Sequence, residues 1–377
     1  RTSLYYRRHG FRKTVAKILL QMIADHSPAA PADDYRLPFI LPLNVVASQE
    51  PGRRINLLIP SIERRHVYGG IATALAMFEK IAPHFDKARI VVTDSPGGDY
   101  DSASFQNYEL AFVNDRYARR LEVGAGDLFI ASAWWSAYIL QPVLTWQQSE
   151  FAQKQQYYFY LIQDFEPGFY PWSGLYALAE TTYRTSHSTI ALFNTDGLKQ
   201  YFEGLGYRFY DSLAFHPAIS RDLLIGSGKA QASRRQSPYQ IVIYGRPSVD
   251  RNCFPLVIEA LYLWYRIFPN SRNWSIVSAG EDHPDIILED GLCVQAAGKL
   301  DLADYQKLLC RSSVGLSLMI SPHPSYPPLE MAAYGLEVVT NSFGNKDLSR
   351  QSGNITSVKL LTPESVADAL AQACNRV

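Results

Sequence analysis

The sequence predicts an α/β fold built from two doubly wound halves. Short β-rich apolar runs alternate with helical patterns from residue 55 onward, and the whole pattern occurs twice. Strands are expected at 55–60, 89–93, 128–132, 157–162 and 189–193, and again at 240–245, 274–280, 291–296, 314–319 and 336–341. The polar stretch 220–238 is the expected linker between domains at 51–219 and 239–377. In such sheets ligands bind at the carboxyl ends of the strands, so the functional residues should follow strands.

Composition excludes several classes of protein. The 377 residues carry 36 Lys+Arg and 36 Asp+Glu, a formal net charge of zero. Because 47% of the chain is hydrophobic and only 19% is charged, it can bury large cores and cannot be mostly disordered. A zero net charge disfavours a general nucleic-acid binder, which has to neutralise a phosphate backbone. No apolar run reaches the roughly 18 residues that a transmembrane helix needs.

The four cysteines, at positions 253, 293, 310 and 374, show no C-x-x-C spacing. Zinc sites and redox motifs need paired cysteines, so neither is expected, and a reducing, cytoplasmic compartment is predicted. We expect no metal and no cofactor.

Residues 1–50 form an expected extension that begins with a basic amphipathic helix. Its cationic residues precede the first acid, Asp25, and its apolar residues recur at helical spacing; they are Val15, Ile18, Leu19, Met22 and Ile23. Such a helix docks on the protein's own body or, through residues 1–24, lies on the anionic inner face of the plasma membrane. The chain begins at Arg1, and we expect it to be part of a longer protein.

A pair of glycines, Gly69 and Gly70, follows the first strand and precedes a helix expected from Ile71. Paired glycines let the backbone approach a ligand and point free N–H groups at an anion. A tight strand-to-helix turn needing positive φ is an equally good interpretation.

The fourth predicted strand leads into a loop that holds Asp164 and Glu166 among aromatic and proline residues. Carboxyl groups beside aromatic rings lose water, which raises their pKa and suits acid or base catalysis. The rings of this loop, Phe169 and Tyr170 among them, can stack on a sugar or a base. The alternative is a salt-bridged loop that caps the following helix.

Two cations follow strands of the second half. Arg246 ends its first strand and offers a fork suited to phosphate, and Lys299 follows its third strand. Each cation alone could be an ordinary surface charge. Together, at one sheet edge, they predict a clamp for a diphosphate.

Residues 321–335 carry the densest signal. Ser325 is expected to cap a short helix that has prolines at its first positions and ends at Gly335. The free N–H groups of this helix would face a phosphate near Tyr326, and Glu330, one turn in, could bind the two hydroxyls of a ribose. A proline-stiffened turn with an exposed acid is the alternative.

These residues together resemble the GT-B glycosyltransferases of glycosyltransferase family 4, and most closely the WsaF-type rhamnosyltransferases of bacterial surface polysaccharide assembly. The likeness covers residues 40–377 and is carried by the stretches 55–73, 162–172, 244–252, 298–300 and 316–341. It implies two Rossmann-like domains facing across a cleft, a dTDP-rhamnose donor held by the carboxyl-terminal domain, an acceptor glycan held by the amino-terminal domain, and retention of configuration without metal.

The resemblance also implies roles for single residues. Arg246 and Lys299 resemble the diphosphate ligands, Ser325 and Tyr326 the phosphate or sugar contacts, and Glu330 the ribose acceptor. Asp164 and Glu166 fall on the acceptor side as the catalytic candidates. The wider family has a further glutamate where this chain has Pro322, so its usual contact with the donor sugar is missing here.

The leading hypothesis is a retaining, metal-independent glycosyltransferase that moves rhamnose from dTDP-rhamnose to a growing bacterial surface glycan. The expected partners are the nucleotide sugar, a glycan or lipid-linked glycan acceptor, and a second copy of the chain. A two-lobed carbohydrate-binding module without catalysis is one rival. Another is a metal-dependent transferase in which Asp99 and Asp101 hold a divalent ion on the nucleotide.

Overall fold

The structure is a computed structural model that describes residues 36–377 except 68, 186–187, 216–222, 224–238 and 289–291. The predicted basic helix and nearly all of the predicted linker lie outside the described residues. Residues 1–41 form a unit apart from 42–377, and its described part contains one 3-10 turn, Pro38–Ile40. All that follows concerns 42–377.

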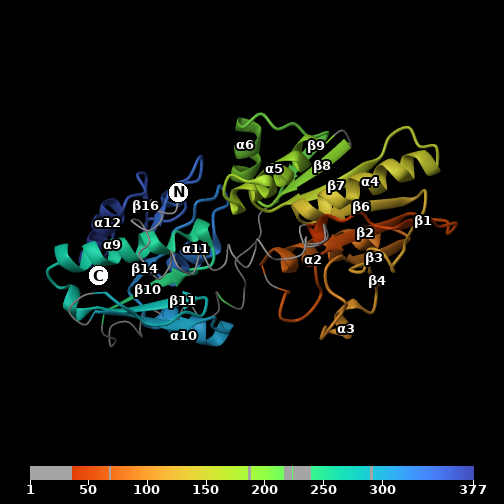
Figure 1. The fold of residues 1–377 in the computed structure, drawn as a ribbon. Coiled ribbons are helices and arrows are strands. Elements are labelled where there is room, and N and C mark those ends of the chain that lie inside the picture. The colour runs from red at the N-terminus through yellow and green to blue at the C-terminus, as the bar shows by residue number, and fades with distance from the viewer. Residues whose placement is uncertain (1–35, 68, 186–187, 216–222, 224–238, 289–291) are drawn as a thin grey trace, which may run out of the picture. The chain divides into compact units, whose positions relative to one another are not determined.

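The amino-terminal half is a seven-stranded, wholly parallel sheet (Figure 1). Its strand order is β4, β3, β2, β6, β7, β8, β9. In chain order the strands are β2 (Arg54–Ile59), β3 (Lys87–Val92), β4 (Glu109–Phe112), β6 (Asp127–Ala131), β7 (Tyr157–Ile162), β8 (Ser188–Phe193) and β9 (Asp211–Ala214). A separate parallel pair joins β1 (Val45–Ala47) to β5 (Leu121–Val123).

Helices cover both faces of this sheet, which is why its central strands are apolar throughout. Leu57 packs in one core cluster with Phe78 of α2 (Gly69–Ile81). Its neighbour Leu58 points to the other face and packs with Leu140 of α4 (Trp134–Glu150). Adjacent residues of a strand face opposite sides, so both positions must be apolar. The remaining helices of this half are α3 (Ser102–Phe105), α5 (Gly174–Thr181) and α6 (Asp196–Gly204), with 3-10 turns at η3 (Ala82–His84), η4 (Glu166–Phe169) and η5 (Thr182–Arg184).

The carboxyl-terminal half is a second seven-stranded sheet in the order β12, β13, β11, β10, β14, β15, β16. In chain order the strands are β10 (Gln240–Gly245), β11 (Ser275–Gly280), β12 (Ile286–Ile287), β13 (Cys293–Gly298), β14 (Val314–Leu316), β15 (Glu337–Asn341) and β16 (Ile355–Val358). Six strands run parallel, and β12 runs antiparallel to β13 at the edge.

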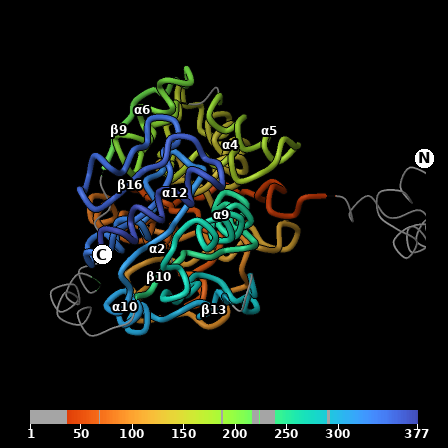
Figure 2. Tube along the Cα trace, turned by 90° about the vertical axis from the view of Figure 1, so that its left-hand side faces the viewer, coloured from red at the N-terminus to blue at the C-terminus, as the bar shows by residue number. Residues whose placement is uncertain are grey.

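Four helices cover this second sheet: α9 (Phe254–Ile267), α10 (Leu302–Arg311), α11 (Tyr326–Ala333) and α12 (Pro363–Asn375). The helices α9 and α12 lie side by side (Figure 1 and Figure 2) and share a core with β10, in which Trp264 is fully buried. On the other face, Met331 of α11 packs with Leu308 of α10. The 3-10 turns of this half are η7 (Asp250–Asn252), η8 (Ser271–Asn273) and η9 (Leu348–Arg350).

The predicted fold class of two Rossmann-like sheets is confirmed, and each of the ten predicted strands corresponds to an observed one. Several details differ. The strand expected at 314–319 ends at Leu316, the strand expected at 291–296 lies at 293–298, and the helix expected from Ile71 begins at Gly69. The outer strands β4, β9, β12 and β16 and the pair β1 and β5 were not predicted. Outer strands are short and only partly buried, so they lack the continuous apolar runs that mark the central strands.

Candidate functional site

A pocket of about 430 Å³ is lined by residues that follow strands in both sheets. Pro60 follows β2, Gln163 follows β7, and Asn194 follows β8. From the second sheet come Arg246, directly after β10, and Met319, shortly after β14. The carboxyl ends of parallel strands are where such sheets bind ligands, and this mostly apolar pocket has several charged and polar side chains on its wall.

Most of the predicted site residues line this pocket. Those that do are Gly69, Gly70, Asp164, Glu166, Phe169, Arg246, Ser325 and Tyr326. Lys299, Glu330 and Tyr170 are not among the lining residues. The backbone N–H of Lys299 donates to Asp282 (3.3 Å). Glu330 accepts a hydrogen bond from the hydroxyl of Tyr305 (3.2 Å), and burial raises the pKa of Glu330.

Tyr170 has a structural role that the sequence did not indicate. Its hydroxyl accepts a hydrogen bond from the indole N–H of Trp134 (2.9 Å), and the two rings meet edge to face. This ring therefore supports the amino end of α4.

The amino end of α2 lies at the pocket. Gly69 has a φ of 48°, which is a left-handed conformation that favours glycine. The side-chain amide of Gln163 donates to the carbonyl of Gly70 (2.9 Å), and a Cβ at Gly70 would stand 3.0 Å from the same nitrogen. The sequence left two interpretations open, a tight turn and a helix end that faces a ligand. The structure shows the tight turn, and both glycines line the pocket. The first N–H groups of a helix have no acceptor within the helix and can bind an anion.

The second helix end at the pocket, that of α11, differs from the prediction in two ways. Ser325 occupies the predicted N-cap position, but its side chain makes no capping hydrogen bond. Its backbone has a φ of 68°, a strained value for serine, and its N–H donates to Nδ1 of His323 (3.1 Å). Moreover, Pro327 and Pro328 have no N–H, so of the first three helical positions only Tyr326 offers a donor to a phosphate.

The hydroxyl of Ser325 is nevertheless placed to meet a ligand. Ser325 is only 3% exposed, and its hydroxyl has no hydrogen-bond partner among the described residues. Buried hydroxyl groups almost always have a partner, and an orphan on a pocket wall is suited to a ligand atom.

Asp164 and Glu166 are buried, 9% and 8% exposed, and do not lie on an exposed loop as the sequence suggested. Asp164 Oδ1 accepts hydrogen bonds from the hydroxyl of Ser321 and from the N–H of Phe165. Ser321 belongs to the segment after β14, so this contact joins loops of the two sheets.

Glu166 both lines the pocket and caps a helix. Its Oε2 accepts the N–H of Trp134, the first residue of α4 (2.6 Å), and lies 3.4 Å from the hydroxyl of Tyr160. Burial is the main cause that raises the pKa of Glu166 to about 8. The carboxyl is therefore protonated at neutral pH and can donate a proton or a hydrogen bond.

The raised pKa predicts a pH dependence of stability. In the unfolded chain this carboxyl has a pKa near 4.5. Between pH 5 and pH 8 the folded protein thus holds a proton that the unfolded chain has lost, and stability falls as pH rises, by at most about 1.4 kcal/mol per pH unit. Urea unfolding of the wild type and of Glu166→Gln across this range should give a shallower slope for the variant. Identical slopes would contradict the assignment.

Sequence reasoning missed Arg251. Its guanidinium lies 4.1 Å from the centre of the Phe169 ring, and its Nε is buried without a hydrogen-bond partner among the described residues. Burial lowers the pKa of Arg251. The charge of Asp164 opposes this shift and the charge of Arg246 adds to it, but an arginine remains cationic. The available signal was its place five residues after Arg246, within the turn η7.

Two further residues near Asp164 were also missed. His323 lines the pocket, and because its Nδ1 accepts from Ser325, its neutral ring carries the proton on Nε2. Burial lowers its pKa, so the ring is neutral at pH 7. Lys346 is 6% exposed and donates to the carbonyl of Met319 (2.7 Å); burial lowers its pKa to about 8.

The aspartates of the metal-dependent alternative have structural roles. Asp101 caps α3, accepting from the N–H of Ala103 (3.2 Å) and the hydroxyl of Ser104 (2.9 Å), and Asp99 pairs with Arg64 (3.7 Å). Neither lines the pocket. In the described part of the chain no three His, Cys, Asp or Glu side chains gather as metal ligands would.

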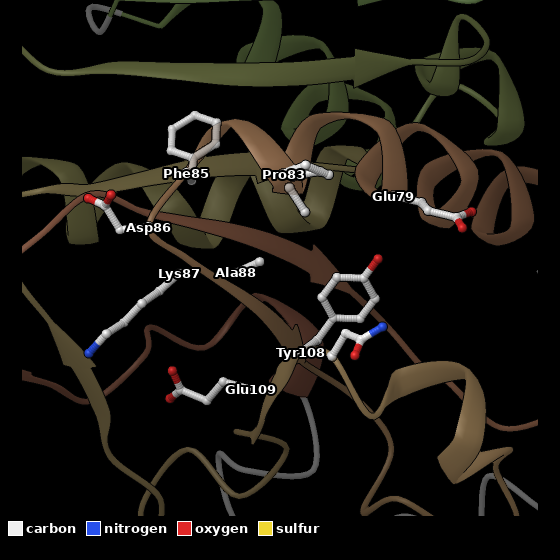
Figure 3. Close-up of a pocket in the computed structure, with 10 residues that line it drawn as sticks. Glu79, Pro83, Phe85, Asp86, Lys87, Ala88, Tyr108 and Glu109 are labelled. Carbon is white, nitrogen blue, oxygen red and sulfur yellow. The ribbon is translucent and has the colours of Figure 1, made fainter.

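A second pocket, of about 680 Å³, lies near the amino end of β3 and the carboxyl end of α2 (Figure 3). Its charged side chains are Glu79, Asp86, Lys87 and Glu109. Three carboxylates against one ammonium would repel a diphosphate, so the smaller pocket is the better candidate for a nucleotide.

Two further findings concern the cysteines and membrane-spanning helices. All four cysteines are free thiols. Within the described ranges no helix has the length and hydropathy to cross a membrane.

Comparison with known proteins agrees with this geometry. The family profile of the WsaF N-terminal domain matches residues 54–196, and that of the WsaF C-terminal domain matches residues 239–371. The O-antigen biosynthesis protein RfbC of Myxococcus xanthus is 32% identical over 285 residues, which are 73% of this chain and 21% of that protein. The chain thus spans about a fifth of the length of that curated relative.

Solved structures of glycosyltransferases share the fold. WaaG, a glycosyltransferase involved in lipopolysaccharide biosynthesis, matches with a TM-score of 0.56 and 15% identity over 85% of this chain and 90% of its own. HepE of Anabaena, in complex with UDP and glucose, matches with a TM-score of 0.52 and 13% identity over 85% of this chain and 89% of its own. At these identities the likeness establishes the fold, which is GT-B.

Proposed function

We propose that this chain is a retaining rhamnosyltransferase that needs no metal, because it belongs to the WsaF family of GT-B glycosyltransferases and its pocket gathers cations around a diphosphate-sized space. The donor would be dTDP-rhamnose and the acceptor a growing bacterial surface glycan. The observation that carries the proposal is the convergence of Arg246, Arg251 and the amino end of α2 on one pocket.

The charges of this pocket suit the departure of a nucleoside diphosphate. As the bond from the anomeric carbon to the phosphate oxygen breaks, its electron pair stays with the diphosphate. Two guanidinium groups and the N–H groups of Gly69, Gly70 and Tyr326 can stabilise that negative charge, as a metal ion does in other transferases.

Transfer with retention can proceed on one face of the sugar. The acceptor hydroxyl forms the new bond to the anomeric carbon, and its proton passes to the departing phosphate oxygen. No protein nucleophile is then required. Asp164 and the protonated Glu166 would orient the acceptor and the donor sugar beside Phe169 by hydrogen bonds. If Asp164→Ala and Glu166→Ala both kept near-full transfer activity, this role would be wrong.

We also propose donor contacts for three other predicted residues, Glu330, Lys299 and Ser325. Glu330 is half-buried and its carboxyl could accept the hydroxyls of a ribose, next to the hydrogen bond it accepts from Tyr305. Lys299 would approach the diphosphate from the end of β13. Ser325 offers its unpartnered hydroxyl to a phosphate or sugar oxygen.

The proposed cellular setting follows from a relative and from the sequence. The name of the Myxococcus xanthus relative, O-antigen biosynthesis protein, supports a surface glycan as acceptor. A lipid-linked acceptor at the inner face of the membrane, contact through residues 1–24 and pairing of two copies remain expectations of the sequence.

Calorimetric binding of thymidine, uridine and guanosine diphosphates in the presence of a chelator tests the donor site. Wild type is expected to bind thymidine diphosphate most tightly, and Arg246→Ala to weaken that binding by about 1.5–3 kcal/mol, the value of a hydrogen bond to a charged group. Arg350→Ala, an exposed arginine paired with Asp347, is the control and should bind like wild type. Binding of none of the three nucleotides would remove the donor site and favour a carbohydrate-binding module. Binding that requires a divalent ion would favour the metal-dependent alternative.

A further inference from the structure

We infer that Trp172 and Tyr176 form a stacking platform for the sugars of an extended acceptor glycan, beyond the pocket that holds the reacting groups. The inference rests on the proposed function, because it supplies the acceptor side of that reaction. Neither residue was among the predicted site residues.

Among the residues that the structure describes, Trp172 is the most exposed large apolar side chain, at 91% exposure. Its ring stacks on that of Tyr176, with centroids 4.9 Å apart and planes 28° apart. Ser173 lies between them and caps α5 by accepting the N–H of Tyr176 (3.3 Å). Tyr176 thus lies in the first turn of α5, and Trp172 directly precedes the residue that caps this helix. Exposed apolar surface of this kind is unfavourable unless something covers it.

The platform follows the pocket wall in the chain, because Phe169, which lines the pocket, precedes Trp172 by three residues. Another ring contact lies beside Asp164, where Phe165 meets Tyr201 edge to face with centroids 5.7 Å apart. The Tyr201 ring also lies 6.2 Å from that of Phe343. Beside it, Gly344 has a φ of 57°, and a Cβ there would meet the Tyr201 ring at 2.9 Å. Because Gly344 has no side chain, the Tyr201 ring can pack directly against the backbone at this position. Aromatic rings therefore lie beside the carboxyl groups of the pocket and, three residues after Phe169, at Trp172.

Aromatic rings are well suited to sugars. A pyranose has a face of C–H groups, which carry a slight positive charge, and the face of an aromatic ring is negative. A rhamnose also has a methyl group that adds apolar area. A row of rings can therefore bind successive sugars of a chain, as rows of rings bind successive bases of single-stranded nucleic acids.

Charge favours a glycan over a lipid surface as the occupant. The segment 167–179, which carries both rings of the platform, contains no Lys, Arg, Asp or Glu. Peripheral binding to an anionic membrane depends on cations beside the inserted aromatic residues.

The test uses the full chain with saturating thymidine diphosphate and purified O-polysaccharide fragments of two and of six sugars, followed by saturation-transfer NMR and calorimetry. Trp172→Ala is expected to weaken binding of the six-sugar fragment about tenfold, in line with the loss of one stacked ring. Binding of the two-sugar fragment, which reaches only the pocket, should change less than about twofold on the same argument. Trp172→Phe should retain most of the affinity.

Tyr239→Ala is the matched control, because Tyr239 stacks on Trp274 with the same centroid distance of 4.9 Å but precedes β10, at the other end of the strand from the pocket. It should bind both fragments like wild type. Unchanged six-sugar binding by Trp172→Ala would overturn the inference. So would failure of wild type to bind any fragment, or co-sedimentation with anionic vesicles that is lost in Trp172→Ala. Nucleotide binding, measured in the same samples, separates these results from a failure of the proposed donor site.

Discussion

Replacing Arg251 by methionine is expected to lower kcat/KM for sugar transfer by about 10²- to 10³-fold, the usual cost of removing one donor that stabilises a developing oxyanion. Methionine keeps the length and apolar stem of the side chain, so the cavity stays filled. What is lost is a partly buried cation that interacts with Asp164, Arg246 and Glu166 and whose buried Nε has no hydrogen-bond partner among the described residues. A cation that has a buried N–H without a partner is suited to an anionic ligand.

Arg266→Met provides a matched control for this prediction. Arg266 also places its guanidinium over an aromatic ring, 4.4 Å from the centre of Tyr262, but it is an exposed residue at the end of α9. Its variant should have wild-type steady-state kinetics. Should Arg251→Met keep kcat/KM within threefold of wild type while folding normally, the leaving diphosphate is stabilised by other groups.

Replacing Asp127 by alanine is expected to destabilise the fold by about 3–5 kcal/mol, the cost of leaving a buried charge without its partner. Asp127 is 2% exposed and accepts two hydrogen bonds from Arg54 (2.7 and 2.9 Å). It also accepts from the side-chain amide of Asn56 (3.2 Å) and the N–H of Gly124 (2.7 Å). Arg54 and the fully buried Arg89 share the cluster and would lose their main buried counter-charge.

Urea unfolding of Asp127→Ala against Asp304→Ala measures this effect. Asp304 forms an exposed ion pair with Lys307 (2.7 Å), and such a pair contributes about 1 kcal/mol or less. Both variants replace an aspartate by alanine, so the difference between their free energies of unfolding reports the effect of burial. A cost below about 1 kcal/mol for Asp127→Ala would mean that the two arginines find other partners or water in the folded protein.

The elements that sequence analysis predicted best are those with local signals. The strand β7 at 157–162 and the strand β10 at 240–245 were predicted at their observed bounds, because a strand buried on both faces must be apolar along its whole length. The glycine pair at 69–70 was found for a similar reason, since only a few residue types suit a left-handed turn.

At one point local signals predicted a helix start correctly but not the hydrogen bonds around it. A serine before two prolines is a common helix start, yet the Ser325 side chain caps nothing, because its N–H is turned toward His323 and its φ is positive. The neighbouring segment is held by a hydrogen bond from Ser321 to Asp164, 157 residues away in sequence. Contacts at that distance in the chain leave no periodicity by which they could be recognised.

The sequence by itself determined the two sheets, the order of their central strands along the chain and the loops proposed to carry function. These features depend on the spacing of apolar residues and on turn residues, which can be recognised from neighbouring positions in the sequence. Only the tertiary structure decided the chemistry of those loops. It buried Glu166 so that its carboxyl stays protonated, brought Arg251 onto Phe169, and left Trp172 exposed on a helix end. Burial and pairing set the charge of a side chain, and both depend on residues that meet only when the chain has folded.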